Sequence, residues 1–264
     1  MGPTQKVVVM VSGGKDSLCT LDVCIKRFGR ENVVGALMYL VKDLDCEWQY
    51  VRKLEKRYGI EVVGVPHYEL SRLLRDSVYR PVSVANQSIR LLKQSDTENF
   101  IREVTGVEWI AWGMRAADSI VRNAYLKRIQ GVDQKQRRVY PIWTWKKPDV
   151  YGYLHARNLP VPKVTGGTKN FTGGVSLDPS CLVWMKEHFP GDYQKVLKVF
   201  PFAGAAVFRH ETMGIDPVAD AKAQFKARKQ HAKEVAKELE ARKSSAAAGP
   251  ALEVPEMHHQ TRAS

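Results

Sequence analysis

The chain has 264 residues, 44% of them hydrophobic, which is enough to bury a full core in one large domain or in a domain with an extension. No apolar run approaches the roughly 20 residues of a membrane-spanning helix, and the first residues lack a signal peptide's apolar core, so we expect a cytoplasmic protein without a membrane partner. The net charge of +13 points to nucleic acid, to a polyanionic nucleotide substrate or only to a basic soluble enzyme.

A β-branched segment over residues 6–11 predicts a buried strand, and it leads directly into the loop Ser-Gly-Gly-Lys-Asp-Ser. The two glycines of this loop allow backbone dihedrals that turn several N–H groups toward one anion. A helix predicted to begin near the end of the loop adds the positive end of its dipole, while the lysine adds a cation and the serines add hydroxyl donors. The predicted phosphate-binding residues are Ser12, Gly13, Gly14, Lys15, Asp16 and Ser17.

This loop differs from a Walker A loop, which needs glycine where Val9 stands and Ser or Thr where Asp16 stands. Ser-Gly-Gly-Lys-Asp-Ser after a strand is instead characteristic of the PP-loop ATP pyrophosphatases, and the chain resembles that superfamily. The resemblance implies cleavage of ATP between its α- and β-phosphates, transfer of AMP to a substrate, and retention of pyrophosphate in the loop. The alternative is a glycine-rich turn with an incidental lysine and serines.

Strands and helices alternate after the loop. Apolar residues at helical spacing predict a helix that stops at Gly29, followed by a buried strand over residues 33–40. A second helix over about residues 47–58 ends at Gly59, and a third strand covers residues 60–65. This order predicts an α/β fold with a doubly wound parallel sheet of about five strands. The resemblance to the PP-loop superfamily implies that this fold is adenine nucleotide alpha hydrolase-like. Such sheets bind ligands at the carboxyl ends of their strands.

An acidic loop, residues 43–45, follows the second predicted strand. Magnesium prefers carboxylate oxygens shared with phosphate oxygens. Asp16 and Asp45 are therefore the predicted metal ligands, and ATP with Mg²⁺ is the predicted cofactor set.

The polar segment over residues 69–99 is predicted to be a helical insertion that closes over the site. A fourth strand over residues 107–112 runs into Gly-Met-Arg, which places Arg115 at the carboxyl edge of the sheet. Ser119 and Arg122 follow it. Because arginine suits forked contact with phosphate, we predict that these residues contact the nucleotide. The alternative for Arg122 is a pair with a surface carboxylate.

Residues 115–147 carry nine Lys or Arg against two Asp. This concentration predicts a basic surface beside the site, suited to tRNA or DNA. A solvated basic loop over residues 127–138 is the alternative.

The second half of the chain extends the resemblance. Pro-Ile-Trp-Thr-Trp at residues 141–145, Asp-Val at 149–150 and the Gly-Met-Arg turn are similar to segments of the phosphoadenosine-phosphosulfate reductase family, a branch of the PP-loop superfamily. The similarity covers roughly residues 6–201. Adenylating members of this branch, such as the ATP sulfurylase small subunits, keep the full phosphate loop, as this chain does. They usually have Asp-Thr-Gly after the second strand, where this chain has Asp-Leu-Asp.

The cysteines bear on the choice between reductase and transferase. Cys19, Cys24, Cys46 and Cys181 form no CxxC pair and no zinc-ligand pattern, which predicts buried free thiols. Reductases of the family attack sulfur with a cysteine near the C-terminus. In the C-terminal third of this chain the cysteine is Cys181, and no second thiol follows that could resolve a mixed disulfide.

The function predicted from these features is ATP-dependent adenylyl transfer, with Lys15 and Arg115 as catalytic residues that offset the charge of departing pyrophosphate. The acceptor is left open between a base in tRNA or DNA and a sulfur-related small molecule. A sulfonucleotide reductase using Cys181 and a non-catalytic nucleotide-binding regulator are the alternatives.

The composition changes beyond about Pro217. We predict a PP-loop nucleotide-binding domain over residues 1–205 and a basic extension over residues 206–264, helical at first and then flexible. The extension carries a thin apolar stripe that suits packing or homo-oligomer formation better than nucleic-acid binding.

Overall fold

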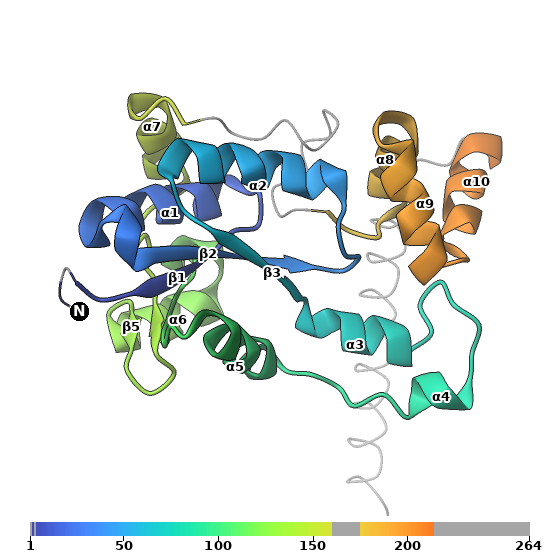
Figure 1. Ribbon diagram of the computed structural model, residues 1–264, viewed down its shortest axis with the longest axis horizontal. Helices are drawn as coiled ribbons and strands as arrows, with labels where there is room; N and C mark the ends of the chain where they lie inside the picture. The colour runs from blue at the N-terminus through green and yellow to red at the C-terminus, as the bar shows by residue number, and fades with distance from the viewer. Residues whose placement is uncertain (1, 3, 160–174, 214–264) are drawn as a thin grey trace, which may run out of the picture. The chain divides into compact units, whose positions relative to one another are not determined.

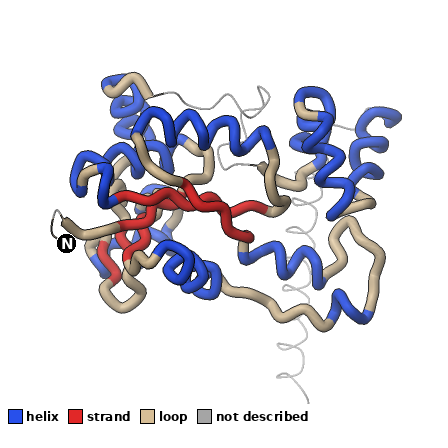
Figure 2. The backbone as a smooth tube through the Cα atoms, in the orientation of Figure 1, coloured by secondary structure: helices blue, strands red, loops and turns tan. Residues whose placement is uncertain are grey.

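The computed structural model describes residue 2, residues 4–159 and residues 175–213, all within one compact unit spanning Met1–Gly214. A six-stranded sheet runs through it with the strand order β3-β2-β1-β4-β6-β5 (Figures 1 and 2). The strands are β1 (Val7–Met10), β2 (Val33–Tyr39), β3 (Val62–Pro66), β4 (Trp109–Ala111), β5 (Val132–Asp133) and β6 (Arg138–Val139).

Neighbouring strands are parallel except for β5, which pairs antiparallel with β6 at the edge. The predicted α/β fold with a doubly wound parallel sheet is therefore confirmed, with one strand more than the five expected. The extra strand comes from the short β5–β6 hairpin, whose two-residue strands are too brief to show an alternation of apolar and polar residues.

Helices cover both faces of this sheet. The α-helices are α1 (Lys15–Phe28), α2 (Asp45–Tyr58), α3 (Tyr68–Arg75), α4 (Val84–Gln87), α5 (Gln94–Thr105), α6 (Ile120–Ile129), α7 (Lys147–Ala156), α8 (Pro179–His188), α9 (Pro190–Val199) and α10 (Ala203–Met213), and the 3₁₀ helices are η1 (Arg30–Asn32) and η2 (Ala116–Asp118). Helices α1 and α2 end at Gly29 and Gly59, as predicted, because both glycines have positive φ.

The residues of β1 alternate between two cores. Val7 and Val9 pack with buried side chains of α1, α2 and α7, whereas Val8 and Met10 pack with Ile101 of α5. Figure 1 shows α1, α2 and α7 on one side of the sheet and α5 and α6 on the other. Helix α5 is therefore a layer of the fold, so residues 94–99 of the predicted insertion belong to that layer. Residues 69–93 contain most of α3 and all of α4, and for them an insertion over the site stays a prediction.

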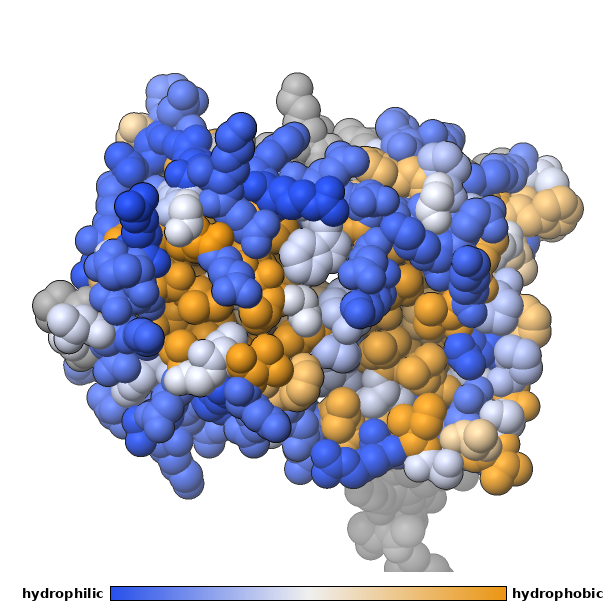
Figure 3. Space-filling view, in the orientation of Figure 1, coloured by the Kyte–Doolittle hydropathy of each residue, from blue (hydrophilic) through white to orange (hydrophobic). Residues whose placement is uncertain are grey.

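Helices α8, α9 and α10 form a third apolar cluster against the start of α2. There the buried carboxylate of Asp192 accepts a hydrogen bond from the backbone N–H of Cys46 at 2.8 Å, which satisfies one of the free N–H groups of the first turn. The predicted boundary between residues 205 and 206 falls inside α10, and the predicted tail helix lies outside the described residues. Figure 3 shows hydrophilic side chains over α2 and hydrophobic ones below it, toward the sheet and α3.

A buried ion pair ties α5 to β6. The carboxylate of Glu98, only 1% exposed, accepts forked hydrogen bonds from Arg138 at 2.8 to 3.0 Å. At the surface nearby, Arg137 pairs with Glu108 at 2.6 Å. Arg137 and Arg138, two cations of the predicted basic stretch, are therefore engaged in ion pairs within the fold.

We expect Glu98→Ala to lower the free energy of unfolding by about 3 kcal/mol, because it leaves the Arg138 charge buried without its partner. The matched variant Glu108→Ala removes an exposed partner and should cost about 1 kcal/mol or less. Urea unfolding of both variants measures the difference, and equal losses would contradict this account of the pair.

Candidate active site

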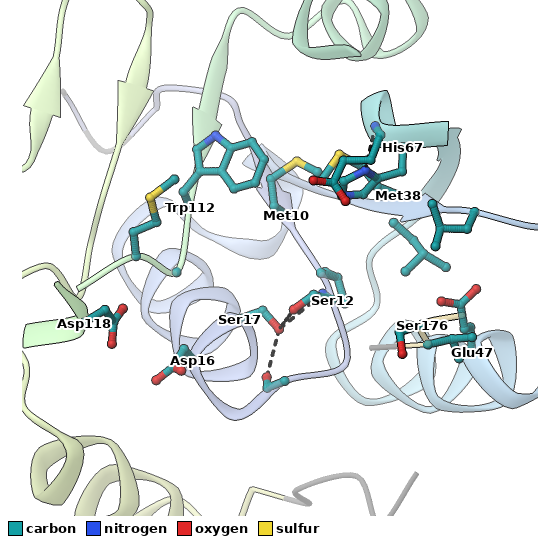
Figure 4. Close-up of a pocket in the computed structure, with 18 of the residues that line it drawn as sticks. Met10, Ser12, Asp16, Ser17, Met38, Glu47, His67, Trp112, Asp118 and Ser176 are labelled. Atoms are coloured by element: carbon teal, nitrogen blue, oxygen red, sulfur yellow. Dashed lines mark hydrogen bonds between the residues drawn. The ribbon is translucent and has the colours of Figure 1, made fainter. Parts of the chain in front are cut away.

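A cavity of about 490 Å³ opens where the carboxyl ends of four strands meet (Figure 4). The residues that follow β1, β2, β3 and β4 all contribute to its wall, as expected for a doubly wound sheet. Its volume falls in the range of small-molecule sites. From these four positions the lining residues are Val11, Ser12, Gly14, Asp16, Ser17, Leu40, His67, Glu69, Trp112, Gly113 and Met114.

Hydrogen bonds inside the phosphate loop hold it in shape. The Ser17 hydroxyl donates to the carbonyl of Gly14 at 2.8 Å and accepts from the backbone N–H of Ser12 at 3.3 Å. Gly13 has φ of 72°, a region that favours glycine. The loop is therefore folded before any anion arrives, and Ser17 fastens it as well as lining the cavity.

Gly113 lets β4 approach the first turn of α1 closely. A Cβ atom at this position would lie 3.0 Å from the backbone carbonyl carbon of Asp16 and 3.1 Å from the backbone nitrogen of Ser17. Only glycine fits without movement of the loop. This contact brings the turn after β4 directly against the phosphate loop.

Asp16 lies between two cations. Its carboxylate contacts Lys15 Nζ at 2.8 Å and Arg115 Nε at 3.2 Å. The Arg115 contact is within ion-pair distance but lacks hydrogen-bond alignment, so Asp16 Oδ1 and the Nε and Nη1 atoms of Arg115 are buried without hydrogen-bond partners. Of these residues Asp16 lines the cavity, and Arg115 lies directly beside it.

A second carboxylate, Asp118, joins the two predicted arginines. It contacts Arg115 at 2.7 Å and Arg122 at 3.4 Å. Arg122 lines the cavity with half of its side chain exposed, whereas Arg115 is buried behind the lining. The Ser119 hydroxyl caps α6 by accepting from the N–H of Arg122.

The structure brings together most of the residues predicted for the site, but not Asp45. Ser12, Gly14, Asp16, Ser17 and Arg122 line the cavity, and Lys15 and Arg115 contact Asp16 from outside the lining. Gly13 and Ser119 support the loop and α6 as described.

Asp45 is turned away from the cavity. Its half-exposed carboxylate pairs with Lys195 at 3.2 Å and Arg52 at 3.8 Å. Asp45 is therefore not part of the cavity in which a metal site is proposed below. Across residues 4–159 and 175–213, no group of three or more His, Cys, Asp or Glu is arranged to hold a metal ion. Asp16 and Asp118 are the carboxylates beside the phosphate loop, and a magnesium ion bound mainly by nucleotide phosphates needs only one or two.

The other end of the cavity contains an acid that the sequence did not point to. Glu47 lies in the first turn of α2, beside Ser176 and across the cavity from Asp16 and Asp118 (Figure 4). Burial raises the pKa of its carboxyl to about 8, against a hydrogen bond from the Val175 backbone that lowers it. An acid in a first helical turn usually reflects the helix dipole, so its sequence position gave no functional signal.

All four cysteines are buried and free. Burial raises the pKa of Cys19 and Cys24 to about 12 and also raises that of Cys181. Reactive thiols need a thiolate and access, so none of these has the properties of a nucleophile in this conformation.

Residues 6–167 match the phosphoadenosine phosphosulfate reductase domain, which covers more than half of the chain. The chain therefore belongs to this family, the phosphoadenosine-phosphosulfate reductase-like branch of the PP-loop superfamily.

Among solved structures, the chain is similar to the U34-tRNA thiolase NcsA from Methanococcus maripaludis with its 4Fe–4S cluster. The identity is 13% and the TM-score 0.43, over 76% of this chain and 72% of that one. No curated protein matches the sequence. Among the helices of the described residues, none is long and apolar enough to span a membrane.

We expect Gly113→Ala to weaken ATP binding about tenfold or more, because the added methyl group displaces the first turn of α1, and such overpacking costs about 1–3 kcal/mol. Gly152→Ala is the matched control, since a Cβ atom there meets nothing within 4 Å. Isothermal titration with ATP measures both variants. Unchanged ATP affinity in Gly113→Ala would show that the loop does not depend on this contact.

Proposed function

We propose that the protein transfers the adenylyl group of ATP to an acceptor and releases pyrophosphate. The observation that carries this proposal is the preformed phosphate loop at the carboxyl end of β1, with unsatisfied donors of Arg115 beside it. Membership in a family of PP-loop enzymes supports nucleotide chemistry at this position.

In the proposed reaction an acceptor atom attacks the α-phosphorus, the bond between that phosphorus and the bridging oxygen to the β-phosphorus breaks, and pyrophosphate carries the charge away. The loop N–H groups and the N-terminus of α1 would hold the pyrophosphate. Lys15 and Arg115 now neutralise Asp16. When phosphate enters, both cations gain a second anion in reach, so their charge is already in place as negative charge develops on the leaving group.

The residues present fit a magnesium ion that arrives with the nucleotide. Asp16 Oδ1 has no hydrogen-bond partner and lies in the wall of the cavity, next to the loop, and Asp118 lies in the same wall. Such an ion would neutralise phosphate charge. Asp16 is therefore the residue that we propose as its protein ligand, with Asp118 as a second candidate.

A reductase reaction through Cys181 receives less support. That thiol is 4% exposed, and burial raises its pKa, so the thiolate needed for attack on sulfur is disfavoured. A non-catalytic regulator would bind ATP in the same loop, and turnover separates it from an enzyme.

For the acceptor we propose a nucleic acid, bound along α6. This helix begins beside Asp118 at the edge of the cavity and exposes Arg122, Lys127 and Arg128. Arg115 and Arg138 are engaged in ion pairs, whereas the cations of α6 are exposed and available to a phosphate backbone, as are Lys135, Lys146 and Lys147 nearby in the sequence.

We expect Lys15→Ala to lower pyrophosphate release by about a hundredfold or more, the effect of removing one charge-stabilising donor from a transition state. The assay supplies α-labelled ATP with tRNA, DNA or small acceptors and measures labelled AMP and pyrophosphate. Lys53→Ala, an exposed change on α2, is the control. Normal turnover in Lys15→Ala would remove the lysine from the mechanism, and ATP binding without turnover of any acceptor would favour the regulator.

We expect the affinity for tRNA or duplex DNA to fall steeply with salt, and Lys127→Ala/Arg128→Ala to reduce the slope of log K against log salt by about two, because two backbone phosphates are then no longer neutralised. Lys53→Ala/Lys56→Ala removes the same charge from α2 and should leave the slope near the wild-type value. Fluorescence anisotropy across a salt series measures the slopes. A flat salt dependence in the wild type would favour a small-molecule acceptor.

A further inference from the structure

The two ends of the cavity differ in charge. The end at the phosphate loop holds Asp16 and Asp118 (Figure 4), and Arg122 pairs there with Asp118 at 3.4 Å. The opposite end has Met38, Glu47, His67 and Ser176 in its wall (Figure 4), and the lining also includes Leu37, Leu40, Glu69 and Val175. That end is apolar with a few polar groups, which is the usual composition of a site for a neutral heteroaromatic ring.

Two of the polar groups at the apolar end, His67 and Glu47, carry little charge near neutral pH, whereas the carboxylate of Glu69 pairs with Arg72 at 3.6 Å. Burial lowers the pKa of His67, and its Nδ1 accepts a hydrogen bond from the N–H of Glu69 at 3.1 Å, so the neutral ring carries its proton on Nε2. Burial and the nearby Asp192 raise the pKa of Glu47. Within the described part of the chain, no Lys, Arg or His lies at ion-pair distance from Glu47.

Glu47 is also incompletely bonded. The Val175 backbone hydrogen-bonds to its carboxyl, but Oε2 is buried and has no partner. An unpaired polar atom in a low-dielectric wall costs free energy that a ligand can recover by supplying the missing hydrogen bond. Other charges near Glu47 are satisfied, since Asp192 is bonded to Lys195 at 2.9 Å and to the N–H of Cys46.

We propose that Glu47 is a specificity-determining residue that accepts a hydrogen bond from the exocyclic amine of the nucleotide base. A carboxyl keeps at least one acceptor oxygen whether or not it is protonated, so this role holds in both states. The apolar side chains around it would cover the faces of the ring, and the phosphates would extend from there to the loop. The inference rests on the proposed use of ATP.

The test compares ATP with purine riboside triphosphate, which has the same ring and phosphates but lacks the 6-amine. Competition against a fluorescent ATP analogue in the presence of EDTA measures binding without turnover. The wild type should prefer ATP by about tenfold or more, because the analogue leaves the acceptor of Glu47 unpaired. A wild type that binds both nucleotides equally would overturn the inference without any variant.

The variants then assign the preference to Glu47. Glu47→Ala should weaken ATP binding about tenfold, leave the analogue nearly unchanged and bring their ratio close to one. Glu47→Gln keeps an acceptor oxygen and should keep most of the preference. Glu103→Ala, an exposed change on α5, should behave as the wild type. A purely structural acid would change stability in Glu47→Ala but not the ratio, and that result would also overturn the inference.

The outcomes distinguish this inference from the proposed reaction. If the ratio depends on Glu47 but no acceptor yields pyrophosphate, adenylyl transfer fails and base recognition stands. If pyrophosphate is released and the ratio does not depend on Glu47, only base recognition fails. A wild type that does not bind ATP would overturn both.

Discussion

The close approach of β4 to the first turn of α1 is the constraint on which the site depends. Gly113 has no Cβ, and a methyl group there would lie 3.0 Å from the backbone of Asp16. The turn that follows β4 therefore lies directly against the phosphate loop, and Arg115 reaches Asp16 at 3.2 Å. Without this approach the loop would still form, because Ser17 fastens it internally, but the two arginines would lie farther from it.

Charge at the loop is arranged in advance of any ligand. Three cations, Lys15, Arg115 and Arg122, are held by two carboxylates, Asp16 and Asp118. Burying Lys15 and Arg115 unpaired would cost several kcal/mol each, on the order expected for desolvated ions, so the carboxylates stabilise the empty site. They also keep the cations where phosphate charge would arrive, which limits reorganisation during the proposed reaction.

The cavity combines this charged end with a largely apolar one. A nucleotide has the same division, with phosphates at one end and a neutral aromatic base at the other. The helices α8 and α9 contribute to the apolar end indirectly, because they hold the start of α2 through Asp192 and thereby position Glu47. The family match supports nucleotide chemistry, whereas adenylyl transfer and its acceptor are proposals.

Local chemistry in the sequence determined the strand–loop–helix of the phosphate site, the alternation of strands and helices, and the glycine stops at Gly29 and Gly59. These features depend on residues close together in the chain, so patterns of glycine, β-branched and apolar residues reveal them. Only the tertiary structure decided the partners of the charged residues. Asp45 pairs with Lys195, 150 positions away, and does not line the cavity. Arg138 pairs with Glu98, so its charge is neutralised within the fold. Glu47 became a site residue only because α2 packs beside Ser176, and an ion pair or a cavity wall between distant residues leaves no periodic signal in the sequence.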